Sequence, residues 1–599
     1  MKKIIFYIAA LSLMAVACNK AELNPVEGGE EKAPAANMII ETISGTSEMS
    51  TKVTIGNANN SFAWTDGDKI AVHVSKGDSH KYVVTAGATV DPSDATRASF
   101  TVTYEEGYAR DAFAVYPGTI VTASAANYGQ SGASLDVTLP NSYTLEQVSG
   151  ETTPCPMIAT NTPDSDWEFK QLCGLLRLTV NSIPANAKRL EIDFNGKKVC
   201  GSFSVSADVT PGNSVINTAD DTDNDCITIT KDGTSDEPLF SGWGDGKVFN
   251  IPLPVGTYSN ITVTAYDALT DGDAILTMTR TLKNGAATYT ASRKGGIKRT
   301  ISFLVFSVSA TKRVIFAPGN LQATYDATGQ TWSWGFAAHQ YDRIGGNGGN
   351  KLITTTTIES SEPYARLSAD GTVDLFGRST DKTYYGIATS TNVSDYNGTF
   401  VDWGGLDIRK NTTPPYTYYP TNYWHTLSEA EWQYLIGEET YRHTGGTIQW
   451  TEGSTTHVIL NALCTKATVN GIHGLIIFPD YYSGNMPLGV AWDENSISPG
   501  SMVHSGTTGW ASTATSAGWA TLEAEGCVFL PIEGFRIGSY EVQGQVYYNV
   551  LANTSSGYYM SSNSVTNVLR FSNEGFDPNQ GLGSYSYAGR SVRLAHEVK

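Results

Sequence analysis

The chain has little charge, and most of the charge that it has is acidic. Charged residues make up 17% of its 599 residues, and 40 basic against 59 acidic residues give a formal net charge of −19 at pH 7. Because contacts to phosphates need basic patches, this balance argues against nucleic acid as a partner. No long apolar run follows residue 18, so no later segment is predicted to span a bilayer.

The usual sequence patterns of catalytic and metal sites are also missing. No HxxxH, HExxH or GxSxG pattern occurs, so the sequence predicts no metal ligands, no cofactor and no catalytic residues. None of the six later cysteines has CxxC spacing. Two interpretations of them stay open, disulfide bonds and isolated buried thiols. The six cysteines are Cys155, Cys173, Cys200, Cys226, Cys464 and Cys527.

The N-terminus has the order of a bacterial secretion signal. Residues 1–17 start with two lysines, continue with a mostly apolar run and end in small residues before Cys18. The apolar run is shorter than the about 20 residues that a membrane span takes. The end of this signal resembles a lipobox, which implies cleavage before Cys18 and a lipid on its thiol. A plain secretory signal with a chance cysteine is the alternative. Residues 18–38 are predicted to be a flexible linker.

The fold class predicted for the rest is mainly β. Short alternating runs separated by Asp, Asn and Gly turns predict two β-sandwich domains, at residues 39–183 and 184–304. A basic, Gly-rich stretch at 293–298 marks the second boundary. We expect strands at residues 69–74, 99–104, 175–180, 260–266, 474–478 and 527–530.

Residues 305–599 differ, because they hold most of the tryptophans and two predicted helices in an α+β domain. Ser428 and Glu431 form the pattern of a capping box, which predicts a helix at 428–436. A weaker helix is predicted at 521–525, with Gly526 as its stop.

The segment 39–304 carries several motifs of one surface-protein family. They include residues 51–54 (TKVT), 64–70 (WTDGDKI), 113–117 (FAVYP) and 169–178 (FKQLCGLLRL). In their order and spacing, these motifs resemble the fimbrillin (Mfa-like) family of Bacteroidetes. The resemblance implies two β-sandwich domains, a lipid anchor in the outer membrane, and assembly with other pilin subunits by strand exchange. It also implies proteolysis after a basic residue, for which Lys52 is the candidate. A solvent-facing strand lysine is the alternative.

The last segment carries a second set of motifs. Residues 314–322 (VIFAPGNLQ), 424–432 (WHTLSEAEW) and 467–476 (ATVNGIHGLI) resemble a C-type-lectin-like fold of the formylglycine-generating-enzyme type. Enzymes of that type hold copper with two cysteines, and only Cys464 and Cys527 are available here. Because each lies beside an apolar strand, we interpret them as buried thiols.

The C-terminal residues have the composition of antibody-like binding loops. Tyrosine gives contact area at a small entropic cost, and Ser and Asn adapt their hydrogen bonds. We therefore expect a ligand-binding face, with packing of a closing sheet, Tyr on Trp, as the alternative. Arg590 and Arg593 are expected to pair with carboxylates. The candidate ligand-binding residues are Tyr558, Tyr559, Ser561, Asn563, Asn567, Arg570, Asn573, Asp577, Asn579 and Tyr585.

The sequence as a whole predicts a lipid-anchored surface adhesin that works as a fimbrial tip subunit. Its ligand would be a glycan or a protein, bound by the C-terminal domain. The chain is not predicted to be an enzyme. Two alternatives stay open, a metal-dependent oxidase of the formylglycine type and a passive structural cap of a pilus.

Overall fold

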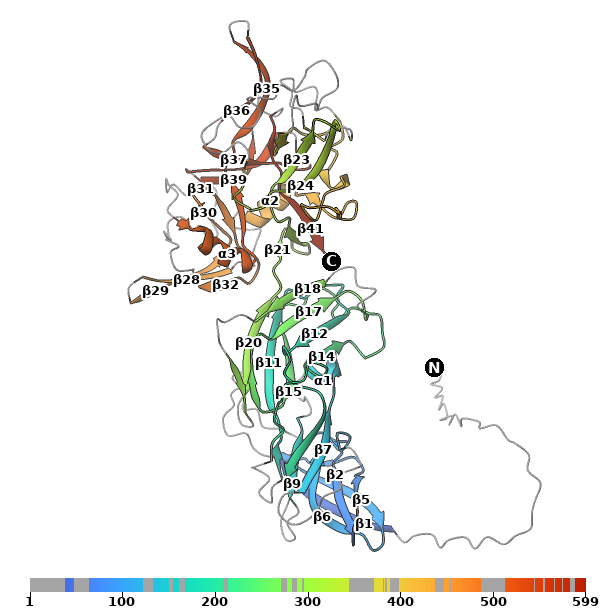
Figure 1. Ribbon diagram of the computed structural model, residues 1–599. Helices are drawn as coiled ribbons and strands as arrows, with labels where there is room; N and C mark the ends of the chain where they lie inside the picture. Colours follow the sequence, from blue (N-terminus) through green and yellow to red (C-terminus); the bar gives the residue numbers. More distant parts are fainter. Residues whose placement is uncertain are drawn as a thin grey trace, which may run out of the picture.

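The chain is mainly β-sheet, as the sequence predicts, and its sheets form three parts in a row (Figure 1). The computed structural model describes residues 38–47, 64–121, 133–149, 155–160, 167–207, 214–270, 277–282, 288–292, 296–343, 371–380, 382, 385–387, 398–436, 446–452, 454–485, 512–542, 545–552, 555–564, 566–573, 575–581 and 588–599. Among these residues, no helix has both the length and the apolar character needed to cross a membrane.

The first part is built on an eight-stranded sheet with the strand order β3-β2-β6-β9-β10-β1-β5-β4. Its members are β1 (Met38–Ser47), β2 (Ala71–Lys76), β3 (Ser79–Val84), β4 (Thr89–Asp91), β5 (Asp94–Glu105), β6 (Ala109–Tyr116), β9 (Met157–Thr160) and β10 (Trp167–Gln171). A separate pair, β7 (Ala133–Leu139) and β13 (Gly201–Ala207), packs apolar side chains with Phe113 and Val115 of β6. On the other face, Trp64 meets Phe100 edge to face at a centroid distance of 4.9 Å.

The second part is a β-sandwich around one apolar core. One sheet is β15-β11-β20 and the other is β18-β17-β12-β14-β8, with the pair β16-β19 and helix α1 beside them. The bounds are β8 (Ser142–Thr144), α1 (Leu145–Ser149), β11 (Gly174–Asn181), β12 (Arg189–Asp193), β14 (Cys226–Thr230), β15 (Lys247–Leu253), β16 (Gly256–Tyr258), β17 (Thr262–Tyr266), β18 (Thr277–Thr281), β19 (Tyr289–Ala291) and β20 (Gly296–Ser302).

The first two parts are not contiguous segments of the chain, unlike the predicted division at residue 183. Strand β11, which the sequence places in the first domain, pairs with β15 and β20 and puts Leu176, Leu178 and Val180 into the core of the second part. Strand β13, placed in the second domain, pairs instead with β7 of the first part. The reason is physical: strand partners are chosen by a shared buried face, which local periodicity does not reveal.

The third part contains several small sheets. It begins between Phe303, which packs in the core of the second part, and Phe306, which packs in a core of the third part. The sheets are β21-β22-β41-β27, β24-β23-β25, β26-β40-β37-β38-β39, β29-β28-β32, β33-β30-β31-β34 and β35-β36. The bounds of the earlier strands are β21 (Phe306–Ser307), β22 (Arg313–Phe316), β23 (Leu321–Asp326), β24 (Thr331–Phe336), β25 (Gly371–Val373), β26 (Leu375–Phe376), β27 (His425–Thr426), β28 (Gly446–Glu452), β29 (Thr455–Ala462), β30 (Cys464–Val469) and β31 (Ile472–Ile477). The later strands are β32 (Ser483–Asn485), β33 (Ser512–Ala514), β34 (Val528–Pro531), β35 (Phe535–Val542), β36 (Gln545–Ala552), β37 (Ser556–Tyr559), β38 (Asn567–Ser572), β39 (Gly575–Gly581), β40 (Arg590–Ser591) and β41 (Leu594–Val598).

Both helices predicted in this part are present, and a short 3-10 helix, η4 (Trp403–Gly405), precedes them. Helix α2 (Glu429–Ile436) begins with the predicted capping box: Ser428 N donates to Glu431 Oε2 (2.7 Å), and Glu431 N donates to Ser428 Oγ (3.3 Å). Helix α3 (Ser516–Ala524) starts earlier than predicted, at an N-cap made by Thr515. The left-handed Gly526 (φ +83°) follows its end, as expected for a helix stop.

Candidate functional site

The two tyrosines at the start of the predicted ligand-binding segment are core residues. Tyr558 is 3% exposed and Tyr559 is fully buried, because β37 is an inner strand of its sheet. The ring of Tyr559 stacks on Phe571 (5.8 Å between centroids) and meets Trp432 edge to face (6.4 Å). Its hydroxyl donates to the carbonyl of Pro531 (3.1 Å), and burial raises its pKa. The prediction that these rings face a ligand is therefore wrong, and the alternative of sheet packing is right for them.

Three other predicted ligand-binding residues lie close to helix α2 or strand β38. Ser561 is fully buried, which also removes it from a ligand face. The side chain of Asn563 is exposed, but its Oδ1 accepts from the backbone of Glu429 (2.8 Å) at the start of α2. Asn573 is exposed, and its carbonyl accepts from Lys466 Nζ (3.0 Å). Tyr585, together with the predicted processing residue Lys52 and the lipidation residue Cys18, lies outside the described residues.

The remaining predicted residues do come together, on the outward side of β38 and β39. In β39, Phe576 and Pro578 are buried, whereas Asp577, Asn579 and Gln580 are half-buried. Asn567 Nδ2 donates to Asn579 Oδ1 (2.6 Å), Asn579 N donates to Asp577 Oδ1 (2.9 Å), and Arg570 donates to Gln580 (3.2 Å). We call this set the hairpin face; its members are Asn567, Arg570, Asp577, Asn579 and Gln580. It offers amide, carboxylate and guanidinium groups, held in place by their own hydrogen bonds.

The printed contacts of Arg593 differ from the predicted pairing with a carboxylate. Arg593 is buried and donates to neutral oxygens: the side chains of Asn320 (3.0 Å) and Gln340 (3.1 Å) and the carbonyl of Phe529 (2.8 Å). Burial lowers its pKa to about 10. Arg590, also buried, donates to the sulfur of Met560 (3.9 Å). Arg593 nevertheless ties together distant segments of the third part.

The two cysteines of the third part lie on opposite faces of the sheet β33-β30-β31-β34. Cys464 packs in the core with Leu475 and Leu530, whereas Cys527 packs in the core with Ile476 and Phe529. Burial raises the pKa of Cys527 well above the usual thiol value. Within the described part of the chain no cysteine is in a disulfide. Two thiols on opposite sides of a sheet do not form the cysteine pair that the predicted oxidase alternative requires.

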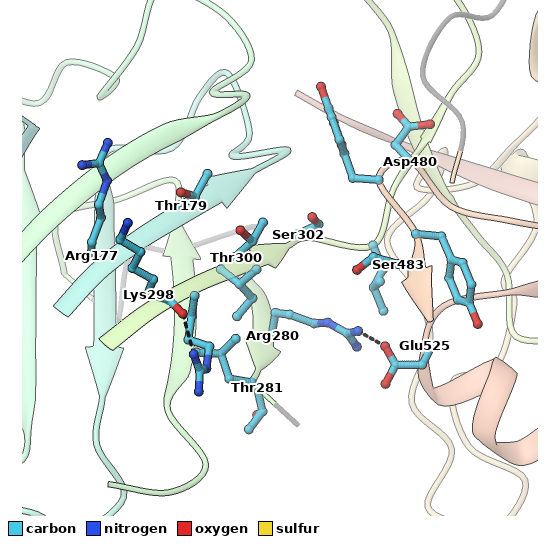
Figure 2. Close-up of a pocket in the computed structure, with 16 residues that line it drawn as sticks. Arg177, Thr179, Arg280, Thr281, Lys298, Thr300, Ser302, Asp480, Ser483 and Glu525 are labelled. Carbon is cyan, nitrogen blue, oxygen red and sulfur yellow. Dashed lines mark hydrogen bonds and ion pairs between the residues drawn. The ribbon is translucent and has the colours of Figure 1, made fainter. Parts of the chain in front are cut away.

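A pocket of about 480 Å³ lies between the second and third parts (Figure 2). Although the whole chain is acidic, the side of the pocket that belongs to the second part is basic. Strands β11, β18 and β20 supply Arg177, Arg280, Lys298 and Arg299. One signal of this site is visible in the sequence, because Lys298 ends the basic stretch that marks the domain boundary.

One charged pair of this pocket joins the two parts. Figure 2 shows Arg280 reaching from β18 to Glu525, at the end of α3, with which it forms an ion pair. Arg280 also donates to the carbonyl of Ala524 (3.2 Å). Arg299 donates to the carbonyl of Lys298 (2.6 Å) and lies 4.2 Å over the ring of Tyr289. Because Arg280 connects β18 of the second part to the end of α3 in the third part, the pocket belongs to the junction between the two parts.

Comparison with known proteins gives only distant structural likenesses. No family model and no curated protein matches the chain. A solved structure described as a candidate cell adhesion protein from Bacteroides ovatus is 14% identical, with a TM-score of 0.26; the match covers 45% of this chain and 92% of that one. A similar candidate from Bacteroides fragilis is 10% identical, with a TM-score of 0.21 and coverages of 44% and 88%. A fimbrial protein from Bacteroides ovatus is 10% identical, with a TM-score of 0.18 and coverages of 48% and 58%. At these scores the likeness carries no argument about function.

Proposed function

We propose that this protein is an adhesin of the bacterial surface, that it is the tip subunit of a fimbria, and that it binds a glycan or protein with its third part. The observation that carries this proposal is the row of three parts in Figure 1. The third part lies at the opposite end of the row from β1, the first described strand. A chain held at its N-terminal side, by the lipid expected on Cys18 or by a neighbouring subunit, would present the third part outward.

The position of β1 supports the assembly step of this proposal. Strand β1 lies inside the eight-stranded sheet, antiparallel to β5 from Met38 to Thr46 and parallel to β10 at its C-terminal end. Of its side chains, Ile43 is buried in the core, whereas Met38 and Ile40 are 54% and 70% exposed. Cleavage after Lys52 and departure of β1 would open the edges of β5 and β10, and an open edge is a template for a strand of another chain.

The hairpin face is the proposed ligand site. It combines hydrogen-bond donors and acceptors on two adjacent strands, which suits the hydroxyl groups of a glycan or the polar surface of a protein. Its internal bonds, such as that from Asn567 to Asn579, hold the side chains before a ligand arrives and so reduce the entropic cost of binding.

Binding of the purified full chain to glycan and surface-protein arrays tests this function. The triple substitution Asn567→Ala, Asp577→Ala and Asn579→Ala should weaken binding at least tenfold, because three polar contacts are lost. The matched control replaces three outward polar residues of β5 in the first part, Ser99, Thr101 and Thr103, with Ala and should bind as the parent does. Circular dichroism should be the same for all three chains. An absence of binding to any array, or equal binding by both variants, would contradict the proposal.

A further inference from the structure

Two histidines and an aspartate converge on the first part, far from the hairpin face. His73, His80 and Asp111 lie on the adjacent strands β2, β3 and β6, and their ligand atoms all lie within 4.8 Å of one another. The Nδ1 atoms of His73 and His80 are 3.6 Å and 3.7 Å from the same oxygen, Oδ2 of Asp111. The two imidazole rings are nearly parallel, with centroids 5.3 Å apart.

The strand register explains why these side chains meet. Across the hairpin of β2 and β3, His73 is opposite Tyr82 and Ser75 is opposite His80, so the two histidines are diagonal neighbours on one face. On the other side, the pairing of β2 with β6 is irregular between Val72 and Val74, at the position of His73. Such irregularities re-aim side chains, and here the one in β6 brings Asp111 beside His73.

From this geometry, we propose that His73, His80 and Asp111 form a binding site for one divalent transition-metal ion, with Zn²⁺ as the best fit. Imidazole nitrogen and carboxylate oxygen are ligands that zinc accepts. A tetrahedral zinc with bonds of about 2.0–2.1 Å places neighbouring ligand atoms roughly 3.4 Å apart, close to the two distances to Asp111. Three protein ligands leave the fourth position for water or for a group of a partner.

The surroundings of the site agree with this assignment. His73 is fully buried, whereas His80 and Asp111 are partly exposed. An ion can therefore reach the site from the surface, and the buried His73 holds one ligand in a fixed position. Burial, which outweighs the attraction of Asp111, lowers the pKa of His73 to about 4, and the neutral imidazole is the form that binds metals. The neighbouring cations have other partners: Arg110 contacts Glu41 (2.7 Å), and Lys81 contacts Glu105 (3.3 Å).

A bound ion would connect three strands side by side in the sheet. Strand β2 is the middle one, between β3 at the edge of the sheet and β6. Metal binding to the folded chain stabilises it by mass action, so the unfolding temperature should rise with the concentration of free ion. The site would therefore strengthen the edge of the eight-stranded sheet that β3 forms.

Titration calorimetry of the full, tag-free chain with Zn²⁺ tests the proposal, and Co²⁺ absorption reports a tetrahedral site. The parent chain should bind one ion, and His80→Ala and Asp111→Asn should each weaken that binding at least tenfold. Because both replaced residues are partly exposed, these variants should remain folded. The matched control is His339→Ala, which removes an exposed histidine that lies 3.0 Å from Asp342, and it should bind as the parent does.

Three results would overturn the assignment. They are no saturable binding by the parent chain, binding that both His80→Ala and Asp111→Asn leave unchanged, and binding that His339→Ala abolishes. Thermal unfolding gives a second test that does not depend on the heat of binding. Zn²⁺ should raise the unfolding temperature of the parent chain but not that of the two site variants.

Discussion

Glu533, which follows β34, is almost completely buried beside another carboxyl group, that of Asp374. Ser591 Oγ donates to Glu533 Oε2 (3.0 Å). Burial first, and then the charge of Asp374, raises the pKa of Glu533 well above its usual value, although the charge of Arg343 acts in the other direction. Glu533 therefore keeps its proton to a higher pH in the folded chain than an ordinary glutamate does. This buried group affects the pH dependence of stability.

The sign of this pH dependence follows from the raised pKa. The folded state holds a proton on Glu533 at pH values where the unfolded state, with a pKa near 4.3, has lost it. The stabilisation is therefore complete below about pH 4 and is lost as the pH rises toward the folded-state pKa. Glu533→Gln carries no titrating proton and can still accept from Ser591, so it should be more stable than the parent at pH 8, by about 1–2 kcal/mol.

Thermal unfolding of both chains from pH 5 to pH 8 checks this prediction. The difference between Glu533→Gln and the parent should grow as the pH rises. The control, Glu146→Gln, changes an exposed carboxylate in the first turn of α1 and should shift stability by only a few tenths of a kcal/mol. A difference that does not vary with pH would show that Glu533 keeps its usual pKa.

At the scale of single elements, local sequence predicts the strands and the start of helix α2 well, but not the start of helix α3. The predicted strands at residues 69–74, 99–104, 175–180, 260–266, 474–478 and 527–530 all correspond to observed strands, with shifted ends. The capping box of Ser428 and Glu431 is confirmed in both of its hydrogen bonds, because it depends on residues only three apart.

Properties that depend on residues far apart in the chain could not be predicted from the sequence. Tyr559 is buried because its ring packs on Trp432 and Phe571 and its hydroxyl donates to the carbonyl of Pro531. No local pattern distinguishes such a tyrosine from one in a binding loop. The same limit applies to His73 and Asp111, which meet only through the irregular pairing of β2 with β6. The predicted residues Asn567, Asp577 and Asn579 do lie together, because they belong to one local hairpin, and their role in ligand binding stays a prediction.

Strand β1 gives a prediction that tests exchange of elements. A chain that begins at Val53 lacks β1 and exposes the edges of β5 and β10, so it should unfold at a lower temperature and form oligomers on a sizing column. A synthetic peptide with the sequence of residues 38–47 should bind to this shortened chain, raise its unfolding temperature and reduce the oligomers.

The peptide control comes from Gly45. A Cβ atom at this position would lie 3.0 Å and 3.1 Å from the rings of Phe169 and Phe100, so a peptide with Gly45→Leu should not restore stability. If the shortened chain stays monomeric and as stable as the parent, β1 is not a structural member of the sheet, and the strand-exchange proposal fails.

At the scale of the whole molecule, charged side chains hold the second and third parts together. Arg313 of β22 donates to both carboxylate oxygens of Asp245 (2.9 and 2.5 Å) and to Ser182 Oγ (3.0 Å), and lies 4.5 Å over the ring of Trp243. Burial alone would raise the pKa of Asp245, but the bonds and charge of Arg313 outweigh it and hold that pKa below its usual value. The junction is therefore a paired, largely buried ionic contact, in contrast to exposed ion pairs, which contribute little.

Removal of Arg313 should loosen this junction without unfolding either part. Arg313→Ala leaves the partly buried carboxylate of Asp245 without its partner, so we expect a loss of about 2–4 kcal/mol from the contact between the parts. Small-angle scattering should then show a broader distribution of distances, and differential scanning calorimetry should separate one transition into two. Arg97→Ala, which removes an exposed arginine 3.7 Å from Asp94 in the first part, is the control and should change neither. If Arg313→Ala keeps the parent's scattering curve and its single transition, the other contacts suffice to fix the third part, and among them Arg280 with Glu525 is the next to replace.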